Sequence, residues 1–166
     1  MPETFRAFVK EVIESGADGI FFATTEWATR ATLNDEQYAE FGRPYDLRVL
    51  DAAQEGAFNV LHVCKDHNMV RVLDDYPVHA INWAVGSPGN PDLHTVLATS
   101  GKAVIGGLRN ETLRDSGPGH IYAEARAASI QTSNRLWMLG PACSIAVDTP
   151  DANVRAARQV VEQLTI

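Results

Sequence analysis

The residues with the clearest chemical potential are a histidine and a cysteine at positions i and i+2 of one apolar stretch, Phe58 to Asp66. This stretch is expected to form a short strand, in which alternate side chains project from the same face. His62 and Cys64 are then about 6–7 Å apart along the backbone, at about 3.3 Å per residue. Cys143 is the only other cysteine of the sequence. A His, Cys and Cys set is a possible zinc site that leaves the fourth tetrahedral position open.

Each of these residues also has a plainer interpretation. A cysteine is most often a small buried hydrophobic residue, and a His-x-Cys pair is common by chance. Asp66 is a catalytic candidate because it can orient His62 through a hydrogen bond, but the expected role at this position is an N-terminal helix cap. His67 is expected to be a solvated residue at a helix start.

Other polar and aromatic residues also follow predicted strands. Glu26, after the first strand, is a second catalytic candidate and a candidate resting ligand at the fourth metal position, which would close the site. Trp27 and Trp83 are predicted to line a substrate pocket, with core packing as the alternative. Asn82 and Arg109 are predicted substrate contacts because polar groups at strand ends orient ligands. Surface exposure explains Arg109 equally well.

Composition limits the class of protein. The chain has 166 residues, about one domain, with 45% hydrophobic and 21% charged residues, typical of a globular protein with a core. The net charge of −7 argues against nucleic acid or an anionic membrane as a partner. The sequence has no signal-like segment and no run of 18 apolar residues, so a cytoplasmic location is expected. A reducing compartment would keep both cysteines as thiols.

Helical and apolar patterns alternate along the whole chain. Asn34 and Gln37 form a capping-box pattern, Pro44 is expected to bend the helix that follows, and Thr149-Pro150 is typical of a helix start. Strands are predicted at residues 19–24, 58–64, 79–83, 103–108 and 135–140. Helices are predicted at residues 4–15, 34–54, around 69–73, 92–98, 120–133 and 149–164. This order indicates five parallel strands in an α/β fold, either an open doubly wound sheet or part of a barrel. In both, functional groups gather at the C-terminal ends of the strands.

Several segments, in their order, resemble the C-terminal half of the uroporphyrinogen decarboxylase (URO-D) superfamily. They are Gly16-Ala17-Asp18-Gly19-Ile20, Phe41-Gly42-Arg43-Pro44-Tyr45, Leu61-His62-Val63-Cys64, Asn82-Trp83, Gly106-Gly107-Leu108 and Thr149-Pro150-Asp151-Ala152-Asn153-Val154. The resemblance implies a single partial domain over residues 1–166, equivalent to about strands 4–8 of a TIM (β/α)8 barrel. A complete barrel needs about 250 residues, so the first three strands are expected to be absent.

The resemblance also bears on activity. In the superfamily, cobalamin-dependent methyltransferases carry His-x-Cys after strand five and Cys after strand eight, and His62, Cys64 and Cys143 match these positions. The decarboxylases instead resemble one another in a Gly-His-Gly loop after the last strand, where this chain has Gly140-Pro141-Ala142-Cys143. Lys65 departs from the glycine of many relatives, which bears on the local turn and on the charge beside the metal.

Three hypotheses follow. The first is a Zn²⁺-dependent methyltransferase-like enzyme that passes a methyl group from a corrinoid, such as methylcobalamin presented by a partner protein, to a small thiol. The second is a uroporphyrinogen decarboxylase of porphyrin biosynthesis, although the family's Arg and Asp would lie in the absent part. The third is an incomplete half-barrel with unpaired sheet edges, which works only as a homo-oligomer or with an N-terminal half-barrel.

Overall fold

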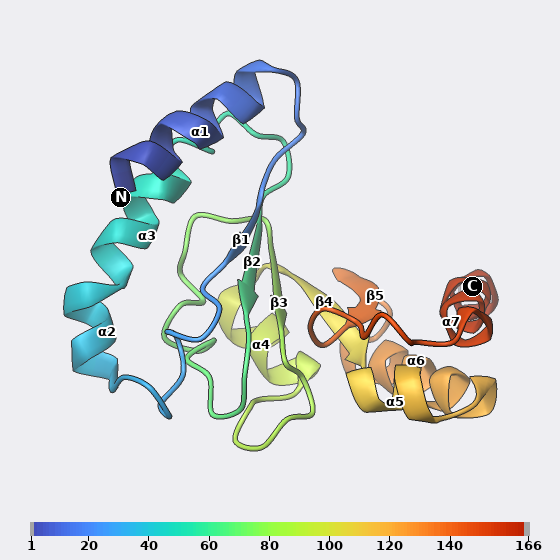
Figure 1. The fold of residues 1–166 in the computed structure, drawn as a ribbon. Coiled ribbons are helices and arrows are strands. Elements are labelled where there is room, and N and C mark those ends of the chain that lie inside the picture. Colours follow the sequence, from blue (N-terminus) through green and yellow to red (C-terminus); the bar gives the residue numbers. More distant parts are fainter. Residues whose placement is uncertain (1, 165–166) are drawn as a thin grey trace.

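Five parallel strands form one curved sheet in which each strand pairs with the next along the chain (Figure 1). The computed structural model describes residues 2–164. The strands are β1 Phe21–Ala23, β2 Val60–Val63, β3 Ala80–Trp83, β4 Ala103–Leu108 and β5 Trp137–Pro141. All five strands predicted from the apolar runs are therefore confirmed, most of them with shorter ends.

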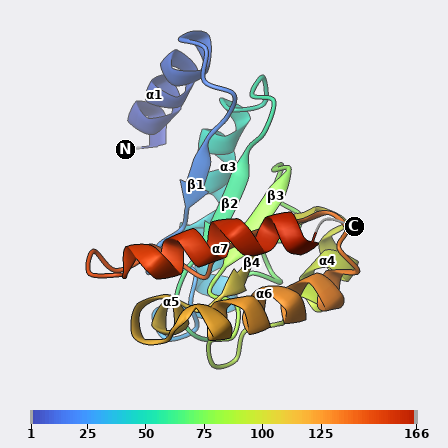
Figure 2. The same ribbon diagram turned by 90° about the vertical axis from the view of Figure 1, so that its right-hand side faces the viewer.

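Helices cover one side of this sheet (Figure 1). They are α1 Pro2–Glu14, α2 Asp35–Phe41, α3 Arg43–Asp51, α4 Leu93–Ser100, α5 Asn110–Asp115, α6 Pro118–Thr132 and α7 Asp151–Leu164. The first helix packs on α3 and the last on α6, and α6 and α7 lie side by side (Figure 2). Among the described residues, no helix is long and apolar enough to cross a membrane.

The two faces of the sheet differ in burial. On the helix-covered face, Leu61, Ile81 and Trp83 are fully buried in the main hydrophobic core. On the opposite face, Phe21 is 60% exposed and Met138 is 40% exposed. An eight-stranded barrel would enclose that second face. The fold is thus α/β and consistent with part of a TIM barrel, with a sheet that does not close.

The helix predicted around residues 69–73 is wrong. The connection from β2 to β3 consists of turns, although Met69, Val70 and Leu73 are fully buried as an amphipathic helix would bury them. The side chain of Asn68 explains the difference, because its amide donates to the carbonyls of Val63 and Lys65 and accepts from the Val70 N–H. Side-chain bonds of this kind offer the backbone an alternative to a helix.

A group that we call the carboxylate cluster holds the other end of this connection. The hydroxyls of Tyr38 and Tyr76 both donate to Asp46 Oδ2, at 2.6 and 2.9 Å. Beside them, Arg43 forms a bidentate ion pair with Asp75, with Nη2 2.6 Å from Oδ2 and Nη1 3.0 Å from Oδ1. The cluster therefore fastens the β2–β3 connection to α2 and α3.

The remaining differences from the predicted helices are local. The helix predicted at residues 34–54 divides at Gly42, just before Pro44, and the Asn34–Gln37 capping box is present. Helix α5 occupies a stretch of six residues that had no helical prediction. Its shortness explains this, since six residues contain too little periodicity to be recognised.

Candidate metal centre

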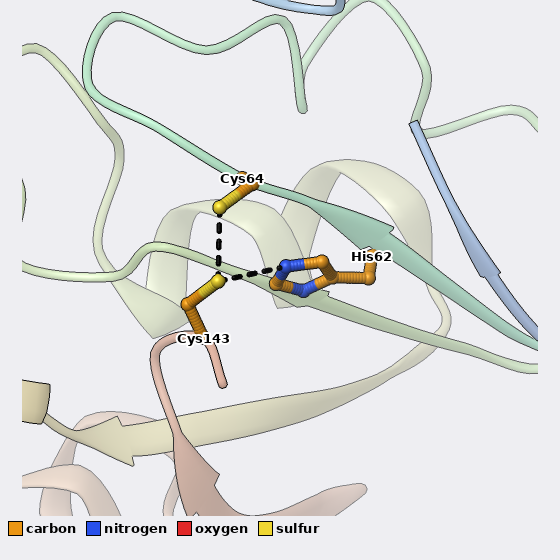
Figure 3. Close-up of side chains that lie close together, drawn as sticks. All are labelled: His62, Cys64 and Cys143. Atoms are coloured by element: carbon orange, nitrogen blue, oxygen red, sulfur yellow. Dashed lines mark hydrogen bonds between the residues drawn. The ribbon is translucent and has the colours of Figure 1, made fainter. Parts of the chain in front are cut away.

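His62, Cys64 and Cys143 converge on the uncovered side of the sheet, and we call them the metal centre (Figure 3). The first two come from β2 and its C-terminal end, and Cys143 comes from the loop after β5. The Sγ atoms of Cys64 and Cys143 are 2.9 Å apart, and Cys143 Sγ is 3.4 Å from His62 Nε2. The three candidate ligand atoms lie within 4.8 Å of one another. The fold thus brings together the three ligands predicted from the sequence.

The spacing of these atoms suits a tetrahedral ion after a small adjustment. Ligands at about 2.3 Å for sulfur and 2.05 Å for nitrogen are separated by about 3.8 Å for two sulfurs and about 3.6 Å for a sulfur and a nitrogen. The distance from Cys143 to His62 is already close to this value. The two sulfurs need to move apart by about 0.9 Å, which side-chain rotation in the loop of Cys143 can supply. One nitrogen and two sulfurs are ligands that zinc prefers.

Electrostatics favour the neutral forms of His62 and Cys64. Burial lowers the pKa of His62, although the hydrogen bond to Asn82 offsets part of this shift. Burial and the neighbouring Cys143 raise the pKa of Cys64 to about 11, with an opposing effect from Lys65. A neutral imidazole is the form that binds a metal. A bound cation would favour deprotonation of the two thiols.

The metal centre opens into a hollow of about 670 Å³ on the uncovered face of the sheet. Its walls are mainly apolar, with Phe21, Ile105 and Ile145 around the ligands. The ring of Phe21 stacks on the imidazole of His62 with 5.5 Å between ring centroids. This stacking explains why His62 is only 6% exposed although it faces the hollow.

The structure does not bring Glu26 into the metal centre. Its carboxylate lines the same hollow but pairs with Lys65 Nζ at 2.8 Å, and this ammonium lowers the pKa of Glu26. The fourth position next to the three ligands therefore faces the hollow. Lys65 itself has a φ of +70°, in the region that favours glycine. A lysine thus holds a backbone conformation that glycine adopts more readily.

Asp66 and Arg109 lie around a second, more polar hollow of about 570 Å³ that shares Cys64 and Cys143 with the first. Arg109 is exposed and donates to the Glu124 carboxylate at 2.7 Å. The backbone carbonyl of Asp66 accepts from the Thr29 hydroxyl. It is Asn82, rather than Asp66, that hydrogen-bonds to His62.

The two tryptophans have different environments. Trp83 is fully buried, and its indole N–H donates to the Pro91 carbonyl at 3.0 Å. It lies on the helix-covered face, which corresponds to the core-packing alternative, and it does not line the hollow of the metal centre. Trp27 is 61% exposed and lines a separate hollow with Phe41 and Tyr45.

Asn110 is a residue near the metal centre that the sequence did not identify as functional. Its side-chain oxygen accepts from the Cys143 N–H at 3.2 Å, and its amide donates to the Ser144 carbonyl at 2.8 Å. It thereby holds the loop that carries Cys143. Its place directly after Arg109, at the end of a predicted strand, was the one available signal.

Comparison with known proteins identifies a family. The family model described as uroporphyrinogen decarboxylase (URO-D) matches residues 1–164, nearly the whole chain. A search of curated proteins found no match.

Proposed function

The chain belongs to the uroporphyrinogen decarboxylase family, and we propose that it is a zinc-dependent, methyltransferase-like member that transfers a methyl group to a thiol. The observation that carries this proposal is the convergence of His62, Cys64 and Cys143 on the uncovered face of the sheet. These ligands come from segments far apart in the sequence, so their meeting depends on the fold.

In this proposal the three side chains hold Zn²⁺ and leave one position toward the hollow. Two thiolates and a neutral imidazole give the site a formal charge of zero. When bound, the ion would supply Lewis-acid activation that lowers the pKa of an acceptor thiol and makes it a nucleophile near neutral pH. Once this face is covered, the apolar walls around Phe21 and Ile105 would exclude water from the acceptor, which would strengthen electrostatic interactions there.

The methyl donor and the substrate contacts belong to the same proposed function. A corrinoid carrying the methyl group would be presented by a partner protein at the C-terminal ends of the strands. Trp27 and Arg109 remain proposed substrate contacts because both are exposed at that end of the sheet. Glu26 remains a proposed catalytic residue through its place in the hollow of the metal centre, and Asp66 through its place around the second hollow.

The first test is metal content. Wild-type chain purified without chelator is expected to contain about one zinc per chain by mass spectrometry, and the Cys64→Ser and His62→Ala variants much less. Zinc-loaded protein is then supplied with methylcobalamin and a panel of small thiols, and thioether formation is measured. Well-folded wild-type protein that binds no zinc would overturn the proposal. Zinc without methyl transfer would limit the site to a structural role.

Decarboxylation of a porphyrinogen is the second candidate, and membership of the family favours it. This reaction needs a proton donor and groups that stabilise charge on the pyrrole. In the hollow of the metal centre, the charged residues Glu26 and Lys65 are paired with each other. Turnover of uroporphyrinogen by the folded chain, retained in Cys64→Ser, would favour this candidate over methyl transfer.

We also propose that the uncovered face is covered in the functional state, by a second copy of this chain or by a separate N-terminal half-barrel. The exposed Phe21 and Met138 support this, as do the outer edges of β1 and β5, with which no other strand of residues 2–164 pairs. Sedimentation at micromolar concentration is expected to show a dimer or larger species for the chain alone. A stable monomer would favour the separate half-barrel, and a monomer that does not change when a candidate partner is added would contradict the association.

A further inference from the structure

We propose that Asn82 is a positioning residue of the metal centre, because its side-chain amide holds His62 in the tautomer whose free Nε2 faces the two thiols. Asn82 is 4% exposed and lies on β3. Its effect on zinc rests on the proposed function, whereas its effect on the tautomer is a property of the chain alone.

The orientation of the Asn82 amide follows from its partners. Its Nδ2 donates to the carbonyls of Ile105 and Pro141 at 2.9 and 3.1 Å. Carbonyl oxygens only accept hydrogen bonds, so the NH₂ group must face them. The amide oxygen Oδ1 is then the atom that lies 2.5 Å from His62 Nδ1. The reversed amide would place an oxygen against two carbonyl oxygens.

The tautomer of His62 follows from the same argument. Since Oδ1 of Asn82 has no proton, the proton must reside on Nδ1 of His62. The other ring nitrogen, Nε2, keeps its lone pair and lies 3.4 Å from Cys143 Sγ. A metal-ligating histidine commonly donates its second N–H to such an acceptor, which fixes the orientation of the ring.

Asn82 also connects the segments that carry the ligands. In the sheet, His62 is paired with Asn82, and Asn82 with Ile105, on neighbouring strands. The carbonyl of Pro141, its other partner, lies two residues before Cys143. One amide therefore links β2, β4 and the end of β5, so that removing it would loosen the histidine and the loop of Cys143 together.

His79 provides an internal contrast. Its Nδ1 accepts from the Asn59 N–H at 2.8 Å, so neutral His79 must carry its proton on Nε2. These two histidines are thus expected to hold opposite tautomers, His62 protonated on Nδ1 and His79 on Nε2. Long-range ¹H–¹⁵N spectra distinguish the two forms without any metal.

The experiment uses metal-free chain with ¹⁵N-labelled histidine above about pH 8, where histidines are neutral. The His62→Ala spectrum identifies the His62 signals. We expect the Nδ1–H pattern for His62 in wild type and its loss in Asn82→Leu. Asn82→Asp should retain the pattern because it keeps an acceptor for Nδ1, although it should lower stability because it loses the donor to the Ile105 and Pro141 carbonyls. Zinc affinity, measured by competition with a chelator, is expected to fall about 10- to 100-fold in Asn82→Leu, and less in Asn82→Asp.

Asn153→Leu is the matched control. Asn153 is 2% exposed and also bridges two carbonyls, those of Leu113 and Ser116, but lies outside the metal centre. It should lose stability without a change in the His62 pattern or in zinc affinity. An Nε2–H pattern for His62 in wild type would overturn the inference, even if Asn82→Leu does not fold. An unchanged pattern in folded Asn82→Leu would also overturn it, whereas failure of wild type to bind zinc would overturn only the proposed function.

Discussion

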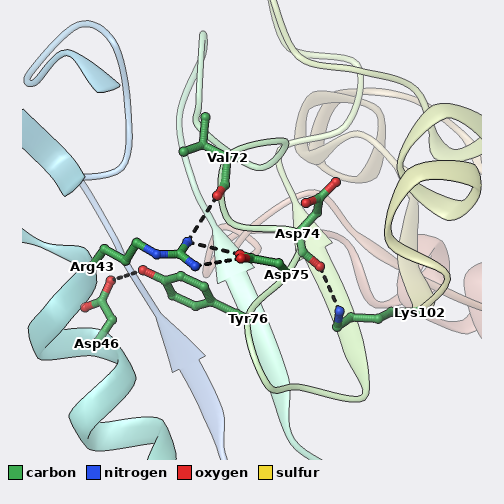
Figure 4. Close-up of polar contacts among 7 residues, drawn as sticks. All are labelled: Arg43, Asp46, Val72, Asp74, Asp75, Tyr76 and Lys102. Atoms are coloured by element: carbon green, nitrogen blue, oxygen red, sulfur yellow. Dashed lines mark hydrogen bonds and ion pairs between the residues drawn. The ribbon is translucent and has the colours of Figure 1, made fainter. Parts of the chain in front are cut away.

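Two polar groups, the carboxylate cluster and the metal centre, bring together segments that are distant in the sequence, and they differ in how their hydrogen-bonding atoms are satisfied. In the carboxylate cluster the polar atoms find partners within the chain, because Asp46 accepts from the hydroxyls of Tyr38 and Tyr76. Figure 4 shows the bond from Tyr76, together with Arg43, which pairs with Asp75 and donates to the Val72 carbonyl. In the metal centre, two thiols and a ring nitrogen face one another. A sulfur is only a weak hydrogen-bond partner.

This difference separates a structural cluster from a candidate binding site. Each group joins segments that are distant in sequence, so long-range convergence alone does not indicate function. In the carboxylate cluster, donors and acceptors are matched within the chain. In the metal centre, soft ligand atoms meet at a hollow, and an ion would give them the partner that the chain does not supply. The two groups should therefore respond to opposite perturbations.

The largest effect is expected on metal affinity when one ligand is removed. Cys143→Ala should lower zinc affinity about 100-fold or more, since zinc sites bind with about 10–16 kcal/mol shared among four ligands. The stability of the metal-free chain should change by less than about 1 kcal/mol, because Cys143 is only half-buried. Chelator competition and urea unfolding measure the two quantities. Ser144→Ala is the control, and equal zinc affinity in both variants would remove Cys143 from the metal centre.

The second prediction concerns the metal-free centre. With Sγ atoms 2.9 Å apart, Cys64 and Cys143 should be oxidised by glutathione disulfide to one intramolecular disulfide, with release of two molecules of reduced glutathione. The rate should rise with pH because burial raises the pKa of Cys64 and the thiolate is the attacking form. Intact mass should fall by two hydrogens, and zinc rebinding should be lost until reduction. Two thiols that remain free to react with maleimide would contradict the prediction, and zinc-loaded chain is the protected control.

The sequence predicted the parts of this arrangement that depend on local pattern and on topology. Apolar runs between turns predicted the strands, and the alternation within β2 placed His62 and Cys64 on one face. Cys143 could be added because the C-terminal ends of parallel strands meet at one edge of a sheet. These steps need no knowledge of which residue pairs with which.

The parts that the sequence did not predict depend on register and on competing side chains. The sequence predicted Asn82 as a substrate contact, and Asn82 does line the hollow. Its hydrogen bond to His62 could not be predicted, because the pairing of the two residues follows only from the register of β2 and β3. The apolar spacing of Met69, Val70 and Leu73 predicted a helix, but the amide of Asn68 binds the backbone there instead. Tertiary hydrogen bonds decided both cases.

The third prediction concerns the carboxylate cluster. Tyr76→Phe should lower the free energy of unfolding by about 1.5–3 kcal/mol, because it removes a hydrogen bond to the buried Asp46 carboxylate. Zinc affinity should remain that of wild type. Urea unfolding and chelator competition measure both, and the exposed Tyr45→Phe is the matched control. A loss of zinc with little change in stability would mean that the carboxylate cluster supports the metal centre, and the contrast between the two groups would fail.

The smallest effect is a pH dependence that belongs to the carboxylate cluster alone. Burial raises the pKa of Asp46, while the hydroxyls of Tyr38 and Tyr76 and the charge of Arg43 lower it in part. The folded chain therefore keeps the Asp46 proton to a higher pH than the unfolded chain does. Between the ordinary and the raised pKa, wild type should lose stability relative to Asp46→Asn as pH rises, with no further change above that window. Urea unfolding of both proteins from pH 4 to 8 measures this difference. If the difference instead grows in favour of wild type with rising pH, the hydrogen bonds outweigh burial, and the cluster is held by a carboxylate that folding makes more acidic.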